Sequence, residues 1–263
     1  MQGRVWRLMG VLLPGFVGLT GCQPQLSPQA EALLAEGAAA YRGGQYDTTV
    51  RRMDVFLQDP SSTSRADEAY YLRGLAKSRL KDVPGARSDL EEAVYRARQA
   101  ELKGKALVEL GEIAFQNGEA AEAERLFTAA LKELPESKPP ADIAHYRLGC
   151  LLQRRGRWAD ADVHFSRLMF LFEGTPMAQR AASMVRCTAW TVQVGAFASA
   201  RNAEAMTQQL REKGLPVNVE KVTRDGKLLH QVQVGRYSAY EQATAALVEV
   251  RKYARDALVI PTR

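Results

Sequence analysis

Four glycines recur at nearly constant spacing in the first part of the chain: Gly37, Gly74, Gly111 and Gly149, which lie 37, 37 and 38 residues apart. A small residue follows each glycine after twelve positions, and a large apolar residue follows four positions later. The small residues are Thr49, Ala86, Ala123 and Ala161, and the large ones are Met53, Leu90, Phe127 and Phe165. A fixed period of this length indicates stacked supersecondary units, each of which buries its apolar face only against its neighbours. We therefore expect this region to fold as a repeat array.

Each copy has the pattern of a helical hairpin. A first helix is expected to end in a short turn, and a second helix follows with apolar residues spaced by three and four positions. The small residues at the glycine and alanine positions allow the two helices to approach closely. Met177 to Arg186 is expected to form a capping helix over the last apolar face. The expected turns are Gly43-Gly44, Val83-Pro84-Gly85, Asn117-Gly118 and Arg155-Gly156.

The pattern resembles the tetratricopeptide repeat (TPR) over about residues 28–172, and the third copy matches it best. The matching residues are Leu110-Gly111, Ala114, Gly118, Ala123, Phe127, Ala130 and Pro135. In that family the inner helix of each hairpin lines a concave surface that binds protein partners. The alternative is that the aromatic residues at these positions pack against the neighbouring repeat. By resemblance, the partner-binding positions are Tyr41, Tyr71, Phe115, Tyr146 and Gln153.

After Cys187 the hydrophobic period changes from helical to alternating. Strands are expected near residues 190–194, 217–223, 228–234 and 257–260, with helices over 200–213 and 240–253. This order predicts a four-stranded antiparallel sheet with both helices on one face. Alternation then directs Val192, Val194, Val232 and Val234 toward the helices. The residues expected on the open face are Thr191, Gln193, Leu229, Gln231 and Gln233.

Carboxamide side chains on an open sheet face suit a neutral ligand rich in hydroxyl groups, because a carboxamide both donates and accepts hydrogen bonds. A merely solvated sheet face is the alternative. Two segments, Val192 to Phe197 and Val232 to Tyr237, resemble the paired signatures of the SPOR domain, and the resemblance spans residues 190–261. It implies peptidoglycan binding through the open face, with a preference for septal glycan strands that amidases have stripped of stem peptides, and with Gln193 prominent. Gln231, Leu229 and Arg236 depart from the residues usual in that family.

The first 22 residues have the pattern of a secretion signal. Arg4 and Arg7 precede an apolar run from Leu8 to Leu19, which is too short to span a bilayer. The residues Leu19 to Cys22 resemble the lipobox of bacterial lipoproteins, which implies acylation of Cys22 and anchoring to a membrane. Gln23 after the cysteine favours the outer membrane over the inner one. We expect a lipid-anchored, periplasm-facing protein of the cell envelope.

The sequence thus predicts an α+β protein of four segments. Residues 1–21 form the signal peptide, 22–27 a short tether, 28–187 the TPR-like array with its capping helix, and 188–263 the βαββαβ SPOR domain of ferredoxin-like order. Cys150 and Cys187 occupy equivalent repeat positions, about a helix spacing apart, so two buried free thiols are expected instead of a disulfide.

Catalytic patterns are missing from the sequence. His145, His164 and His230 are scattered without metal-ligand spacing, and no nucleophile motif or phosphate-binding loop is present. The sequence therefore favours a protein that is not an enzyme and that needs no cofactor and no metal. The net charge of +6 is too small to suggest nucleic acid.

Three functional interpretations follow from these patterns. The first is an adaptor in cell division or wall remodelling that joins glycan strands to an unidentified protein partner. The second is an assembly scaffold in which the array is the functional part and the SPOR domain only localises it. The third is RNA binding, because the RNA-recognition motif shares the strand and helix order, but glutamines stand where that motif needs aromatic residues.

Overall fold

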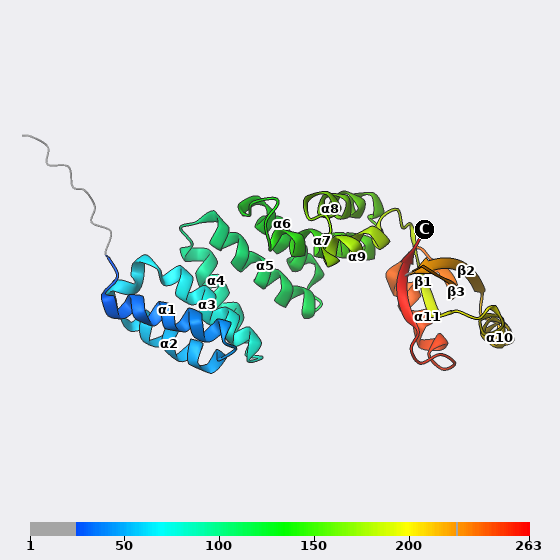
Figure 1. Cartoon of the computed structure of the whole chain (residues 1–263), viewed down its shortest axis with the longest axis horizontal. Coiled ribbons are helices and arrows are strands. Elements are labelled where there is room, and N and C mark those ends of the chain that lie inside the picture. The colour runs from blue at the N-terminus through cyan, green and yellow to red at the C-terminus, as the bar shows by residue number, and fades with distance from the viewer. Residues whose placement is uncertain (1–24, 225) are drawn as a thin grey trace, which may run out of the picture.

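The computed structural model describes residues 25–224 and 226–263, and the side chain of residue 224 lies outside the description. The molecule is elongated, with a helical array at one end and a small sheet domain at the other (Figure 1). The signal peptide pattern and Cys22 lie outside the described residues. None of the helices in the described residues combines the length and the apolar composition of a membrane-spanning segment.

The array consists of four helical hairpins and a final helix. In chain order the hairpins are α1 (Pro28–Arg42) with α2 (Tyr46–Gln58), α3 (Ala66–Arg79) with α4 (Val83–Arg96), α5 (Ala100–Gln116) with α6 (Ala120–Glu133), and α7 (Ala141–Arg154) with α8 (Trp158–Leu171). A short 3-10 helix, η1 (Pro60–Ser64), separates the first two hairpins. Helix α9 (Pro176–Met184) packs on α8 and covers the last face, as the sequence predicts.

The recurring glycines allow the two helices of each hairpin to touch. A Cβ atom at Gly111 in α5 would lie 2.7 Å from Cε1 of Phe127 in α6, which is closer than real side-chain carbons approach. Because Phe127 is completely buried, its ring has no free space into which to move. The interpretation of the glycine period as a close-packing device is confirmed. The corresponding pairs are Gly37 with Met53, Gly74 with Leu90, and Gly149 with Phe165.

One of the four expected turns is wrong. Val83-Pro84-Gly85 forms the first turn of α4, where the Asp82 side chain accepts a hydrogen bond from the backbone N–H of Gly85 at 3.0 Å. The chain instead reverses at Lys81, whose φ of +69° lies in the left-handed region. Proline is favourable at the start of a helix because it has no backbone N–H to leave unsatisfied, so here it marks a beginning and not an end.

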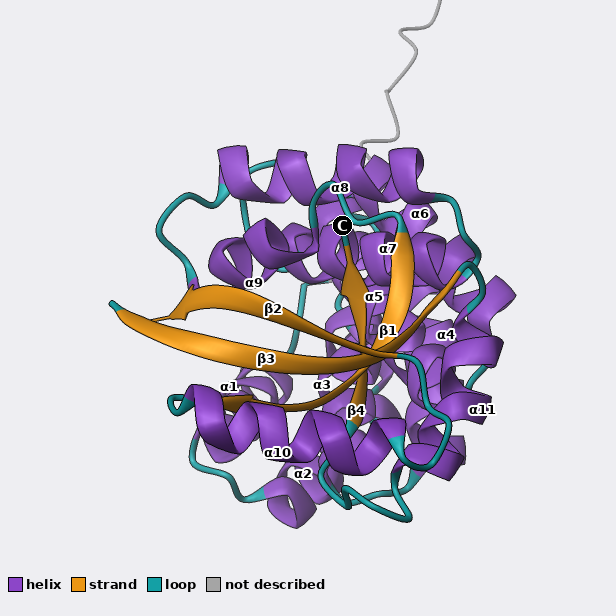
Figure 2. Ribbon diagram, turned by 90° about the vertical axis from the view of Figure 1, so that its right-hand side faces the viewer, coloured by secondary structure: helices purple, strands orange, loops and turns teal. Residues whose placement is uncertain are grey.

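The C-terminal part contains one sheet in the strand order β2-β3-β1-β4, with antiparallel pairing throughout. Its helices α10 and α11 lie on the same side of the strands (Figures 1 and 2). This arrangement confirms the βαββαβ prediction. The elements are β1 (Ala189–Phe197), α10 (Ala200–Arg211), β2 (Val217–Arg224), β3 (Lys227–Tyr237), α11 (Tyr240–Val250) and β4 (Leu258–Thr262).

The four valines expected to face the helices form the core of this domain. Val192, Val194, Val232 and Val234 are buried and pack with side chains of α10 and α11, including Leu210 and Val250. β1 and β3 are longer than expected, and their pairing contains two irregularities in register. At one of them Gly235 adopts a φ of +68°, which allows the strand to bulge and continue to Tyr237.

Residues 185–188 join α9 to β1. Hydrogen bonds attach this junction to the array on one side and to the sheet domain on the other. The backbone N–H of Arg186 donates to both carboxylate oxygens of Asp162 in α8, at 3.0 and 3.1 Å. On the other side, the backbone N–H of Thr188 donates to the carbonyl of Thr262 in β4 at 2.8 Å. The connection is therefore short and hydrogen-bonded to both domains.

Aromatic side chains bring the two domains into direct contact. Trp190 in β1 lies between Trp158 at the start of α8 and Tyr240 at the start of α11, with ring centroids 5.4 and 4.9 Å away. Tyr240 also contacts the array through Arg154 of α7, whose guanidinium carbon lies 5.0 Å from the centroid of the Tyr240 ring. Tilted and edge-on aromatic packing of this kind stabilises an interface beyond the area that it buries.

Candidate functional site

A polar row crosses the open face of the sheet. Strand pairing places Asn218 of β2 opposite Gln233 of β3, Gln233 opposite Gln193 of β1, and Gln193 opposite Leu258 of β4. Directly paired residues of antiparallel strands project from the same face. The row therefore presents three carboxamides on adjacent strands, about 4.8 Å apart per strand, and ends at Leu258, which is 45% exposed. We call these four residues the amide row.

A second row lies beside it, toward the β2–β3 turn. Glu220 is opposite Gln231, and Gln231 is opposite Ala196. The two β3 glutamines are more buried than the sequence suggested, because Gln231 is 7% and Gln233 is 5% exposed. The Nε2 of Gln233 donates to Oε2 of Glu220 at 3.2 Å, which orients both groups. Leu229 lies further along the same face, half-buried and opposite Val222.

Thr191 does not present a free hydroxyl on the open face. It is 1% exposed, and its Oγ1 donates to the carbonyl of Gly235 at 2.7 Å and approaches that of Val234 at 3.3 Å. These carbonyls belong to the irregular stretch of β3, where the ladder is interrupted. The side chain predicted to contact ligand instead completes the hydrogen bonding of the sheet.

A hollow of about 600 Å³ opens at one end of the amide row. Two side chains of the row, Asn218 and Gln233, line it together with Glu220, and the exposed Arg236 and Arg263 lie on its other side. Sequence reasoning missed Asn218 and Arg263 as site residues and treated Arg236 only as a departure from the family pattern. The hairpin signal at residues 225–226 could have identified Asn218. Equal counts from this turn along the two strands pair Asn218 with Gln233.

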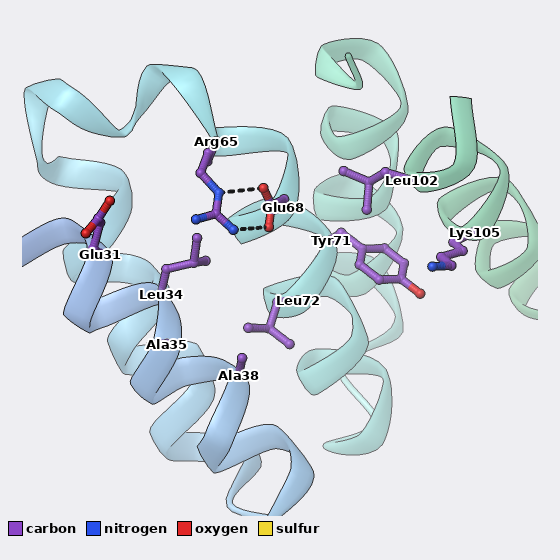
Figure 3. A pocket seen from close by; sticks show the side chains of 10 residues that line it. All are labelled: Glu31, Leu34, Ala35, Ala38, Arg65, Glu68, Tyr71, Leu72, Leu102 and Lys105. Atoms are coloured by element: carbon purple, nitrogen blue, oxygen red, sulfur yellow. Dashed lines mark hydrogen bonds and ion pairs between the residues drawn. The ribbon is translucent and has the colours of Figure 1, made fainter. Parts of the chain in front are cut away.

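The array has a hollow of its own on the face formed by α1, α3 and α5. Tyr71 of α3 lies in it between Leu72 and Lys105, and Leu34 of α1 borders the same space (Figure 3). Burial raises the pKa of the Tyr71 hydroxyl above its ordinary value, and the nearby Glu109 adds to the effect. The hollow is mainly apolar, with charged side chains at its edge. The charged residues are Glu31, Arg65, Glu68 and Lys105, and Arg65 and Glu68 are paired at 2.6 Å.

The other predicted groove residues are engaged within the array. Phe115 lies under two guanidinium groups, those of Arg147 at 4.5 Å and Arg154 at 5.3 Å. Tyr146 packs edge-on against the buried Phe165, with centroids 6.1 Å apart. These contacts correspond to the packing alternative.

Tyr41 and Gln153 also have internal partners. Tyr41 packs against Tyr46 across the α1–α2 turn, with ring centroids 5.6 Å apart. Gln153 is completely buried, and its Nε2 donates to the carbonyl of Met184 at 2.7 Å. The expectation that Gln153 lines the groove is not supported, because its carboxamide holds the end of the capping helix.

Two of the histidines meet although the sequence spacing did not suggest it. Nδ1 of His145 in α7 lies 3.0 Å from Nδ1 of His164 in α8. Burial lowers the pKa of His145 to about 4, with contributions from His164 and Arg167. Burial also lowers the pKa of His164. The described residues contain no cluster of three or more metal-type side chains. Cys150 and Cys187 are free thiols, with Cys187 buried and Cys150 half-buried.

Comparison with known families supports the C-terminal domain. Residues 188–261 match the family model described as SPOR domain. This segment is a SPOR domain. The match includes all four strands and both helices of the sheet domain, so the amide row and its neighbouring hollow belong to the SPOR domain. The family is a peptidoglycan-binding one, and its presence associates the chain with the cell envelope.

Solved structures support the fold of the array. A tetratricopeptide repeat protein from Parabacteroides merdae is 12% identical, with a TM-score of 0.51, and the match covers 72% of this chain and 68% of that one. The PilF protein of Pseudomonas aeruginosa is 14% identical, with a TM-score of 0.50, over 63% of this chain and 69% of that one. Comparison with curated proteins gives no match. The chain therefore combines a TPR-like helical array with the SPOR domain.

Proposed function

We propose that this protein is a non-catalytic adaptor of the bacterial cell envelope, which binds peptidoglycan glycan strands through its SPOR domain and a protein partner through its array. The observation that carries the proposal is the amide row, which aligns Asn218, Gln233 and Gln193 across three strands of a SPOR domain. The carboxamides of Gln193 and Asn218 each donate and accept hydrogen bonds, which matches the hydroxyl and N-acetyl groups of wall sugars, and Gln233 lies buried between them, bonded to Glu220. The buried Gln231 and the hydrogen bond from Gln233 to the exposed Glu220 hold the surface in shape.

The amide row predicts a specific loss of binding in Gln193→Ala. A neutral hydrogen bond contributes about 0.5–1.5 kcal/mol, so affinity for amidase-treated sacculi should fall by about two- to tenfold. Co-sedimentation of the full chain with purified sacculi measures this loss. Gln208→Ala is the matched control, because Gln208 is an exposed residue of α10 on the helical side of the sheet. Equal binding by Gln193→Ala and the unmodified chain would exclude the amide row as the binding surface.

The hollow of the array is the proposed partner site. Apolar side chains in a hollow with a charged edge are typical of surfaces that bind an apolar segment of another protein. Tyr71 is the member of the predicted set that lines the hollow. A chain truncated after residue 187 distinguishes the two interpretations. Loss of septal localisation with loss of function supports the adaptor, whereas uniform localisation with retained function would favour the assembly scaffold.

We place the adaptor at a membrane surface facing the periplasm, with the outer membrane favoured. The proposal rests on the lipobox-like residues Leu19 to Cys22, followed by Gln23. Acyl chains on Cys22 would anchor one end of the molecule, while the SPOR domain engages the wall at the other. Membrane fractionation of a Cys22→Ser variant tests the anchor. The variant should leave the membrane fraction, and retention there would contradict lipidation.

A further inference from the structure

The outer side of α8 carries a row of exposed residues without a charge. Ala159, Val163, Ser166 and Phe170 follow one another at spacings of four, three and four, which places them along one side of the helix. All four are exposed, and α8 packs on α7 and α9 through its other sides. The helix lies along the upper edge of the array in Figure 1. We call these four residues the α8 row.

The repeat provides an internal comparison for this row, because equivalent residues stand at the same distance from each repeat glycine. In the three other second helices the equivalent residues also lie on the surface, but each of those rows contains at least one charged side chain. The equivalent rows are Asp47, Arg51, Asp54 and Gln58 in α2, Pro84, Ser88, Glu91 and Tyr95 in α4, and Ala121, Arg125, Thr128 and Lys132 in α6. The same position in the fold is therefore charged in three repeats and apolar or small in the fourth.

The large residues of the α8 row contribute nothing to the core of the array. Phe170 is 83% and Val163 is 61% exposed, whereas Phe165 and Leu168 on the inner side of the same helix are completely buried. A single exposed aromatic residue such as Tyr95 is ordinary on a protein surface. An uncharged row with two large apolar members on one helix is instead typical of a surface that packs against another helix.

The charges beside the row indicate what that helix is. Asp160 and Arg167 are seven residues apart, so they flank the row on the same side. Each is held only in an exposed ion pair, Asp160 with Arg157 at 2.8 Å and Arg167 with Glu136 at 2.7 Å. Exposed pairs of this kind contribute little, so both side chains can exchange their partners.

Two copies of α8 are complementary when they pack antiparallel about a two-fold axis. Phe170 of each copy then meets the small Ala159 of the other, and Val163 meets Ser166, so that large residues face small ones. In the same arrangement Asp160 of each copy lies beside Arg167 of the other, which pairs opposite charges twice. One surface thus supplies both the apolar contact and the matching charges.

We propose that the α8 row is a self-association surface, on which α8 of a second copy of this chain docks antiparallel. The helix has 14 residues and is about 21 Å long. One helix pair buries less than the about 1,200 Å² of a standard stable interface, so the dissociation constant should be on the order of 10–100 µM. The dimer carries two SPOR domains and two arrays. The inference does not depend on glycan binding or on a partner of the array.

Sedimentation equilibrium from about 1 µM to about 1 mM tests the proposal. All proteins are full chains with Cys22→Ser, so that acyl chains do not drive association. The chain should show a monomer–dimer equilibrium, and Phe170→Glu should raise its dissociation constant about tenfold or more, because it places a charge in the apolar contact of both copies. Tyr95→Glu is the matched control, since Tyr95 occupies the equivalent position of α4 and is 84% exposed. It should leave the equilibrium unchanged.

Reversal of the flanking charges tests the antiparallel arrangement. Asp160→Arg and Arg167→Asp should each raise the dissociation constant about threefold or more, because each places like charges together twice. Both substitutions in one chain should restore the original affinity, which a folding defect would not do. A failure to restore it would overturn the antiparallel arrangement. A monomer at every concentration, or equal effects of Phe170→Glu and Tyr95→Glu, would overturn self-association through the α8 row.

Discussion

At the scale of single residues, the array depends on positions that tolerate no additional atom. Gly111 touches the ring of Phe127, and the other repeat glycines stand in the same relation to a buried large residue. An alanine in a helix is intrinsically better than glycine by about 1 kcal/mol. Here the steric term opposes that gain, because Phe127 is enclosed on all sides by the core.

Gly111→Ala should therefore destabilise the protein despite its better helix propensity. Overpacking a tight core costs about 1–3 kcal/mol, and urea denaturation followed by circular dichroism measures the change in the free energy of unfolding. Gly43→Ala is the control, since its Cβ would meet only ordinary contacts at 3.5 Å and its φ of −82° suits alanine. An unchanged or increased stability of Gly111→Ala would show that the helices can separate without cost.

At the scale of elements, the His145–His164 contact joins α7 to α8 in a way that depends on pH. Both pKa values are lowered by burial, so both rings are neutral in the folded protein near neutral pH. The charged groups near the two rings include Arg167 and Asp160 of α8 and Glu124 of α6. Between about pH 6.5 and 4 the unfolded chain binds a proton that folded His145 does not. The free energy of unfolding must therefore fall as the pH falls through this interval.

Replacing His145 with glutamine should reduce that pH dependence. A lowering of one pKa unit corresponds to about 1.4 kcal/mol, so the unmodified protein should lose more thermal stability than His145→Gln between pH 7 and 4.5. Differential scanning calorimetry at several pH values measures Tm for both proteins. Subtracting one Tm curve from the other removes the contributions of the titrating groups that the two proteins share. Parallel curves for the two proteins would mean that His145 titrates normally in the fold.

At the scale of the whole molecule, the junction fixes the SPOR domain relative to the array. Trp190 lies between Trp158 of the array and Tyr240 of the SPOR domain, and Arg186 is tied to Asp162. We infer that the molecule acts as a stiff spacer and not as a flexible tether. A rigid connection sets the distance and the orientation of the amide row relative to the proposed partner site in the array.

Trp158→Ala should loosen this junction while both domains stay folded. Trypsin should then cut after Arg186 faster than in the unmodified chain, because cleavage requires the junction to open locally. Phe170→Ala, at an 83% exposed position of the same helix, is the control and should leave the rate unchanged. Equal rates for all three proteins would contradict a junction held by aromatic contacts.

The sequence by itself determined the two architectures, because periodicity records burial locally. The 37- and 38-residue glycine spacing specifies stacked hairpins, and the alternating valines specify which sheet face the helices cover. The alternation in the sequence also located Gln193 correctly on the open face. What it could not determine is which side chains on a face remain accessible. Thr191 bonds to carbonyls of β3, and Gln153 bonds to the carbonyl of Met184.

The tertiary structure decided the composition of the site, because strand order and register are set by contacts between distant segments. Asn218 and Gln193 share a row only because β3 lies between β2 and β1. Arg236 and Arg263 meet because the last strand returns beside the first, and the bulge at Gly235 redirects the chain. Local sequence patterns carry no such information, since each of these pairings depends on residues that become neighbours only after the chain has folded.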